Sequence, residues 1–353
     1  MRKYIWLLLG LILTVPGFGQ NDTIDITYKI HDDVSKSLRL FEKDELLELS
    51  LRFDITAFKR NKSKEEYLPA ILTLYLNKTD SINKEIKIRA RGQTRRTICS
   101  FPPIRLNFKK SDSSDDEFNN IDKLKLVTHC EPGHQIYTLK EYLAYKLYNV
   151  LTDYSYRVRL ARINYINTAK KSKPDIEYAY FIEPAEILGK RIHCTEVKTS
   201  NLTQKNIRHE MMDRMAIFNY FIGNTDWSVP IKHNVTIFAQ SYPENPNLAA
   251  IVPYDFDYAG LINADYAVPY ADLGLKSVIE RRYLGICRSQ ETFTNELKEF
   301  SGKKKELIKV INDFPYLNAK TKKEMTMYLE GFFRDFDKHN IIVYKLLNEC
   351  LDF

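Results

Sequence analysis

The sequence predicts an α+β fold in two halves: residues 20–183 as an antiparallel sheet with one inserted helix, and residues 184–353 as a mainly helical half. Two observations predict it. Short apolar stretches with a period of two fill the first half, and after Pro184 the apolar residues recur with the spacing of a helix. The chain has 353 residues, 44% of them hydrophobic, which is enough to build cores in both halves.

The first twenty residues, MRKYIWLLLGLILTVPGFGQ, have the pattern of a secretory signal peptide. A basic start precedes an apolar run, and small residues surround a cleavage position. We therefore expect residues 1–19 to be removed and the mature chain to begin near Gln20, periplasmic or secreted. A retained membrane anchor is the alternative, although the apolar run is short for a spanning helix. No other segment is apolar enough to span a bilayer.

Charge and cysteine content narrow the choice of partners. The formal net charge of +7 is mild, and many lysines lie in mixed-charge helical stretches such as SGKKKELIKV. Such stretches are typical of solvated helix faces, so no nucleic-acid partner is expected.

There are five cysteines, so at least one must stay unpaired within the chain. Cys99 and Cys130 each lie at the edge of a predicted strand in the same half, which makes them the candidate disulfide.

The elements of the first half follow from alternating or continuous apolar runs rich in β-branched and aromatic residues. The predicted strands are 46–54, 67–76, 84–91, 103–109, 124–128, 157–165 and 177–183. A helix is predicted at about 136–151, where apolar residues recur along one face.

The second half begins with a predicted helix at 203–222, with Thr203 as N-cap and Gly223 as its C-terminal stop. A small hairpin is expected from strands at 235–238 and 248–252. Beyond about residue 290 every segment reads as amphipathic helix. The two ends of the hairpin adjoin the motifs GNTDWSVPIKHN, residues 223–234, and YDFDYAG, residues 254–260.

These two motifs carry the groups that phosphoryl transfer needs. That reaction requires a carboxylate to orient or deprotonate the attacking hydroxyl, oxygen ligands for a metal ion, and a cation to hold the phosphates. Asp226 is the candidate catalytic carboxylate and Asn234 a neutral metal ligand. Asp255 and Asp257, two residues apart on a segment expected to be extended, should point to one face. Two like charges on one face predict a cation between them, and Mg²⁺ suits such a site.

The sequence resembles the spore-coat protein H (CotH) family of atypical secreted protein kinases. The resemblance covers roughly residues 84–263, through RARGQTRR, FPPIRLNF, LKEYLAYKLYN, YAYFIEPAEIL and the two acidic motifs, in the family's order. It implies a two-lobed protein-kinase-like fold that uses ATP with Mg²⁺ or Mn²⁺ and acts on a protein acceptor. By resemblance Asp226 is the catalytic-loop aspartate, Asn234 a metal ligand and Asp255 the second metal-binding aspartate, with Asp257 a further ligand or a structural group.

The chain also departs from the family pattern. The family usually shows lysines where this chain has FPPIRL, so Arg105 or Arg91 is expected to hold the phosphates, with Glu141 as the partner of that cation. Glu183 lies where the hinge between kinase lobes would run, and its backbone would meet the adenine. The gap from Asp226 to Asn234 is longer than the family norm.

Other functions remain open from the sequence. An exported protein meets little ATP, which favours a degenerate kinase-like module that binds a nucleotide, a sugar or a partner protein. A structural envelope protein leaves the clustered acids unexplained. A hydrolase could use the same acids to activate water, but the sequence has no G-x-S-x-G motif.

Overall fold

The computed structural model describes residues 39–108, 116–119, 121–171, 173, 175–199, 201–240, 249–338 and 341–352. The predicted signal peptide, residues 1–19, lies outside this part of the chain. Within the described residues the first half contains seven strands, and all seven were predicted from the sequence. They are β1 Leu47–Phe53, β2 Leu68–Tyr75, β3 Ser81–Ala90, β4 Ile104–Asn107, β5 Lys123–Val127, β6 Val158–Asn167 and β7 Asp175–Ile182.

The seven strands close into a barrel in the order β1-β2-β3-β4-β5-β7-β6, so the prediction of a plain antiparallel sheet is wrong. Closure depends on one parallel pairing, in which β1 lies beside β6 with Leu47 opposite Ala161. All other neighbouring strands of the barrel are antiparallel. Alternate residues of each strand point inward, and these side chains form a separate hydrophobic core inside the barrel.

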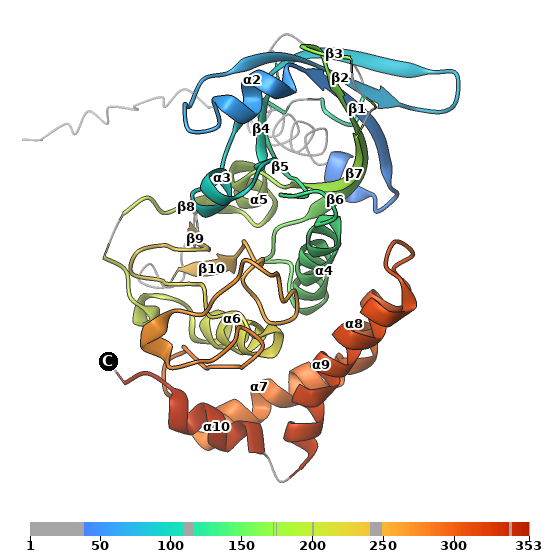
Figure 1. Ribbon diagram of the computed structural model, residues 1–353. Helices are drawn as coiled ribbons and strands as arrows, with labels where there is room; N and C mark the ends of the chain where they lie inside the picture. The colour runs from blue at the N-terminus through green and yellow to red at the C-terminus, as the bar shows by residue number, and fades with distance from the viewer. Residues whose placement is uncertain are drawn as a thin grey trace, which may run out of the picture.

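In the described part of the chain three helices are inserted among these strands, not the single one predicted. They are α2 Ile55–Arg60, α3 Thr94–Ile98 and the long helix α4 Gln135–Leu151. The helix α4 packs on the outer face of β6 and β7 (Figure 1). The start of β6, Val158–Ala161, is therefore buried on both faces. Through α4 the barrel is joined to the core of the helical half, which contains Leu143 and Leu147 of this helix.

The second half consists of helices around a small sheet. Its elements are α5 Ala185–Arg191, β8 Cys194–Glu196, the 3₁₀ helix η1 Gln204–Asn206, α6 His209–Ile222, β9 Val235–Gln240, β10 Ala250–Pro253, the 3₁₀ helix η2 Ala271–Leu273, α7 Gln290–Gly302, α8 Lys304–Asn312, α9 Ala319–Asp337 and α10 Ile341–Glu349. The predicted hairpin is present as β9 and β10, with β8 as a third strand. Figure 1 shows α7 to α10 at the end of the molecule away from the barrel. The architecture is mixed α+β.

The helix α6 ends as the sequence predicted. Gly223 follows it with φ 69°, a left-handed conformation that glycine adopts without steric cost, and the acidic loop starts there. The predicted helical start at Thr203 is instead a 3₁₀ turn, which Thr203 and Asn206 cap reciprocally, and α6 begins only at His209.

Two disulfides are present among the described cysteines. Cys99–Cys130 is the predicted pair, and Cys287–Cys350 was not predicted. Cys194 is free and buried, in agreement with the odd count.

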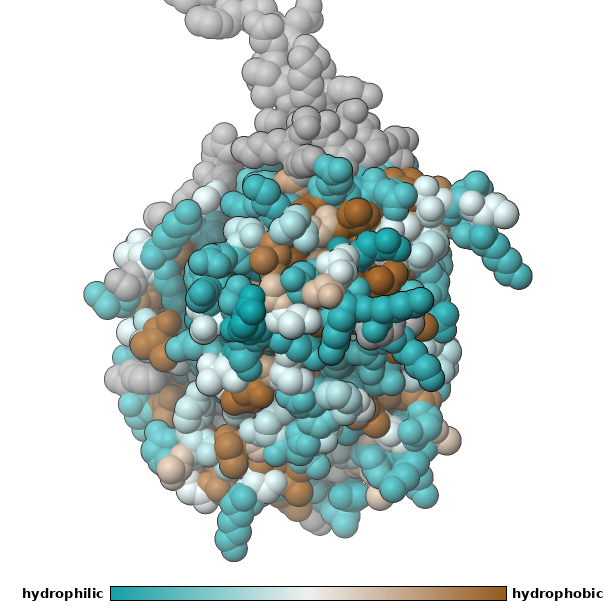
Figure 2. Space-filling view, turned by 45° about the horizontal axis from the view of Figure 1, so that its top comes forward, coloured by the Kyte–Doolittle hydropathy of each residue, from teal (hydrophilic) through white to brown (hydrophobic). Residues whose placement is uncertain are grey.

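In the described part of the chain no helix is long and apolar enough to cross a membrane. The face shown in Figure 2 is mainly hydrophilic, with hydrophobic residues scattered over it.

Candidate functional site

A cleft of about 700 Å³ lies between the barrel and the small sheet and collects most of the predicted site residues. One wall is basic and includes Arg91, Arg105 and the Gly92 turn that follows β3. The opposite wall is acidic. Its predicted members are Asp226, Asn234, Asp255 and Asp257. Glu141 and Glu183 do not line the cleft.

Asp226 is held in one orientation by three side chains from its own half. Its Oδ2 accepts a hydrogen bond from the Asn234 amide nitrogen at 2.9 Å, and the same nitrogen donates to the Asp226 backbone carbonyl at 2.8 Å. Its Oδ1 lies 2.7 Å from His233 Nε2 and accepts from the Tyr270 hydroxyl at 2.8 Å. The carboxylate is nearly buried, so these contacts fix its rotamer. A fixed carboxylate at a cleft wall can position a hydroxyl and take its proton.

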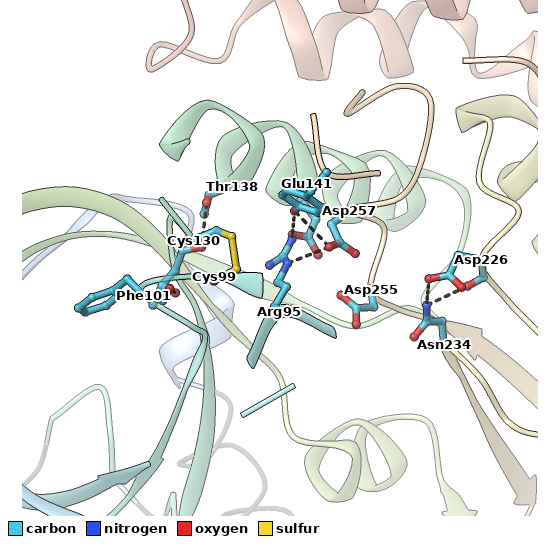
Figure 3. A network of polar contacts seen from close by, with 12 residues as sticks. Arg95, Cys99, Phe101, Cys130, Thr138, Glu141, Asp226, Asn234, Asp255 and Asp257 are labelled. Carbon is cyan, nitrogen blue, oxygen red and sulfur yellow. Dashed lines mark hydrogen bonds and ion pairs between the residues drawn. A yellow bond between two sulfur atoms is a disulfide. The ribbon is translucent and has the colours of Figure 1, made fainter. Parts of the chain in front are cut away.

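Asn234 and Asp255 both have left-handed backbones, with φ of 52° and 63°. Such conformations cost energy in residues other than glycine and are concentrated at functional sites. The backbone N–H of Asp255 donates to the Tyr145 hydroxyl at 2.8 Å, which helps to hold the bend. The expectation that the YDFDYAG segment is extended is therefore wrong at Asp255. Figure 3 shows Asp255 between the Asp226–Asn234 pair and a second group of charges.

That second group is centred on Arg95, a residue that the sequence interpretation did not single out. Arg95 lies on α3 and is buried. Its Nε donates to Asp257 at 2.8 Å and its Nη2 to Glu141 at 2.6 Å (Figure 3). Tyr266 adds contacts of 3.1 Å to both Arg95 and Asp257. The predicted pairing of Glu141 with Arg91 or Arg105 is thus wrong, because Arg95 is the cation that contacts Glu141.

Burial raises the pKa of both carboxyl groups in this network. The pKa of Glu141 is raised to about 7 and that of Asp257 is also raised, because both are desolvated, although Arg95 opposes the shift. Burial lowers the pKa of Arg95, but the attraction of Asp257 and Glu141 outweighs it, so Arg95 stays charged.

The disulfide Cys99–Cys130 positions this network. Cys99 follows the end of α3, and Cys130 lies shortly before α4, which carries Glu141. Phe101 reinforces the link through a backbone hydrogen bond of 2.9 Å to the Cys130 carbonyl. The bridge therefore ties together the two elements that bring Arg95 to Glu141 (Figure 3).

Three acids at or beside the acidic wall could hold a divalent cation. Glu141, Asp255 and Asp257 each bring a carboxylate oxygen to within 4.8 Å of the other two, and Glu141 Oε1 is buried without a hydrogen-bond partner. The Asp255 carboxylate has no hydrogen bond or ion pair within the described residues, so it can bind a cation directly. The Asn234 amide nitrogen is committed to Asp226, which leaves the amide oxygen for a metal.

The basic wall contains a lysine that sequence reasoning missed. Lys125 on β5 lines the cleft, and it is the cross-strand neighbour of Arg105 on β4. Burial, together with repulsion from Arg91 and Arg105, lowers the pKa of Lys125 to about 8. Burial and the nearby arginines also lower the pKa of Arg105. In the described part of the chain none of these three cations forms an ion pair, so together they make an anion site.

The Glu183 side chain has a structural role, and Glu183 does not line the cleft. Arg191 contacts both of its carboxylate oxygens at 2.9 Å, and the Arg157 backbone N–H donates to it at 3.0 Å. The Glu183 backbone N–H already donates to the Arg157 carbonyl. Neither the side chain nor the N–H is available for an adenine.

No protein-family model matches the chain, and no curated protein matches it significantly. Among solved structures, the proinflammatory kinase CtkA of Helicobacter pylori is similar to this chain. The match covers 73% of this chain and 94% of CtkA, with 11% sequence identity and a TM-score of 0.39.

Proposed function

We propose that the chain is an exported kinase of the CotH type, which transfers the γ-phosphoryl group of ATP to Ser or Thr of a secreted or envelope protein. The cleft carries this proposal. It sets Arg91, Arg105 and Lys125, which form no ion pair within the described residues, opposite a wall of acids around a fixed carboxylate. Phosphates of a nucleotide need the cations, and a metal ion beside them needs the acids.

The roles within the site follow from the contacts. Asp226 orients the acceptor hydroxyl and accepts its proton, and Asn234 holds Asp226 in place. Asn234 and Asp255 would hold Mg²⁺ or Mn²⁺, with Glu141 and Asp257 close by. When bound, the metal neutralises charge on the phosphates. Asp257 would be a weaker ligand, because its Oδ2 is already shared by Arg95 and Tyr266.

The alternative is a degenerate kinase-like module that binds an anionic ligand without transferring phosphate. One observation favours it. Arg95 already places a cation between Asp257 and Glu141, so this part of the acidic wall is neutralised by the protein itself.

Metal-dependent binding of ATP tests the proposal. We expect ATP to stabilise the wild-type protein only when Mg²⁺ is present, by about 2.7 kcal/mol at a ligand concentration of ~100 times the dissociation constant. Asp255→Ala should abolish the metal-dependent part and leave the protein folded, because the loss of one of several clustered carboxylates relieves repulsion while alanine at φ 63° costs only about 1 kcal/mol. Thermal unfolding with ATP, with and without Mg²⁺, measures both effects.

The exposed Asp352→Ala variant is the matched control and should behave as wild type. ATP binding that needs no metal, or unfolding of Asp255→Ala on its own, would show that the acids are structural and would favour the binding module.

Lys125 predicts a pH dependence of ATP binding. Its pKa of about 8 in the free protein means that it loses its charge as the pH rises through this value. We expect ATP affinity to fall about tenfold over that transition, the effect of one charge-assisted hydrogen bond of ~1.5 kcal/mol. Lys125→Arg keeps its charge and should remove this fall. Titration calorimetry across the range tests it, and an identical fall in Lys125→Arg would show that another group titrates.

A further inference from the structure

The Tyr270 hydroxyl already lies where the hydroxyl of a phosphate acceptor would contact Asp226. The Tyr270 Oη donates to Asp226 Oδ1 at 2.8 Å, within the range that a general base needs from the hydroxyl it deprotonates. No other hydroxyl in the described residues donates a hydrogen bond to this carboxylate. The Tyr270 side chain is 52% exposed, so one edge of it is open to solvent.

The segment from Tyr266 to Tyr270 contacts the site at both of its ends. Tyr266 contacts Arg95 and Asp257, and four residues later Tyr270 contacts Asp226. Between these anchors the chain has no helix or strand, and η2 begins directly after Tyr270. Val268, between the two tyrosines, is 71% exposed. Tyr266 and Ala267 pack against the core of the helical half, whereas Tyr270 beyond Val268 is held by its hydrogen bond to Asp226.

We propose that Tyr270 is a modification site, phosphorylated by its own chain within one molecule. This proposal rests on the proposed function and adds a tyrosine of the chain itself to the Ser and Thr acceptors of the same site. In the step, Tyr270 Oη forms a bond to the γ-phosphorus of ATP. The bond from that phosphorus to the β–γ bridging oxygen breaks, and ADP leaves with the electron pair. The phenolic proton passes to Asp226 Oδ1, which later releases it to water.

The product explains how the site is cleared for another acceptor. Phosphotyrosine carries close to two negative charges, and the Asp226 carboxylate is a like charge at hydrogen-bond distance from the oxygen that becomes esterified. Repulsion therefore drives the modified side chain away from Asp226. Until then, the Tyr270 hydroxyl occupies the position that the hydroxyl of an external acceptor would take.

The test uses phosphatase-treated full chain with Mg²⁺ and ATP, with casein as external acceptor, followed by mass-spectrometric mapping of phosphate and measurement of ADP. We expect phosphate on Tyr270, accumulating at a rate per molecule that dilution of the protein does not change. Asp226→Asn should lose it. Tyr270→Phe should lack this phosphate, because it has no hydroxyl to accept it. Tyr344→Phe, a tyrosine of α10 with 55% exposure, should match wild type.

Each contrary result has a distinct meaning. Labelled casein with no phosphate on Tyr270 would overturn this inference and leave the kinase proposal standing. A rate per molecule that falls with dilution would overturn transfer within one molecule. Absence of ADP formation, casein labelling and self-labelling together would overturn the proposed function as well.

Discussion

Asp226→Asn is expected to lower phosphoryl transfer by about 10² or more, since general acid–base catalysis by one positioned group contributes on that scale. Asparagine has nearly the same shape and can keep its oxygen toward His233 and Tyr270. Its amide nitrogen then faces that of Asn234, which loses this acceptor but keeps the residue 226 backbone carbonyl, so the loop should stay folded. It cannot accept a proton at neutral pH. The metal-dependent stabilisation by ATP should therefore be preserved while the rate falls.

Initial rates of label transfer from ATP, together with thermal unfolding of both proteins, measure this separation of binding from transfer. Asp153→Asn makes the same change at an exposed acid outside the cleft and should leave the rate as it is. Equal rates in Asp226→Asn and wild type would remove Asp226 from the reaction.

Arg95→Met is expected to lower the free energy of unfolding by about 3–5 kcal/mol, the usual cost of removing one partner from a buried ion pair. Glu141 is fully buried and Asp257 nearly so, and both lose their cation. Without Arg95 to oppose the effect of burial, the pKa values of these two carboxyl groups would rise further. A raised pKa in the folded state costs stability only above the pKa of the unfolded chain, about 4, so the loss should shrink as the pH falls toward that value.

Urea unfolding of wild type and variant at neutral and acidic pH tests this expectation. Arg162→Met is the matched control, since Arg162 is half-exposed and pairs with Glu48 at 3.1 Å on the barrel surface. Exposed pairs contribute at most about 1 kcal/mol. A loss from Arg95→Met no larger than that from Arg162→Met would mean that the buried network does not stabilise the fold.

The local elements of this fold could be predicted from the sequence, but their closure could not. Alternating or continuous apolar runs locate all seven strands of the barrel, and where the residues alternate they also give the inward face of the strand. Such runs do not say which strands are neighbours, and β1 and β6 meet from distant parts of the chain. The helices α2 and α3 have six and five residues, too few for a helical period to appear.

Arg95 and Lys125 were missed for the same reason: the sequence does not show which segments meet in space. In RARGQTRR several arginines lie close together, and the sequence alone does not show which one turns inward. A usable signal was present: Arg95 lies just before Cys99, Glu141 comes soon after Cys130, and these two cysteines were predicted to pair. Lys125 alternates with leucines on a short strand and reads as a solvent-facing residue. The pairing of β4 with β5 places it beside Arg105, on the face of the barrel that lines the cleft.

The fate of the γ-phosphate of ATP tests the central claim most directly. Wild-type mature protein would be incubated with Mg²⁺, γ-labelled ATP and casein, and label would be counted as phosphoprotein, as free phosphate and as intact ATP. We predict that label appears on protein hydroxyls, and that Asp226→Asn or removal of Mg²⁺ prevents it. Label recovered only as free phosphate would identify a hydrolase, and ATP that stays intact would identify a binding module; either result would contradict the claim that this cleft transfers phosphate to a protein.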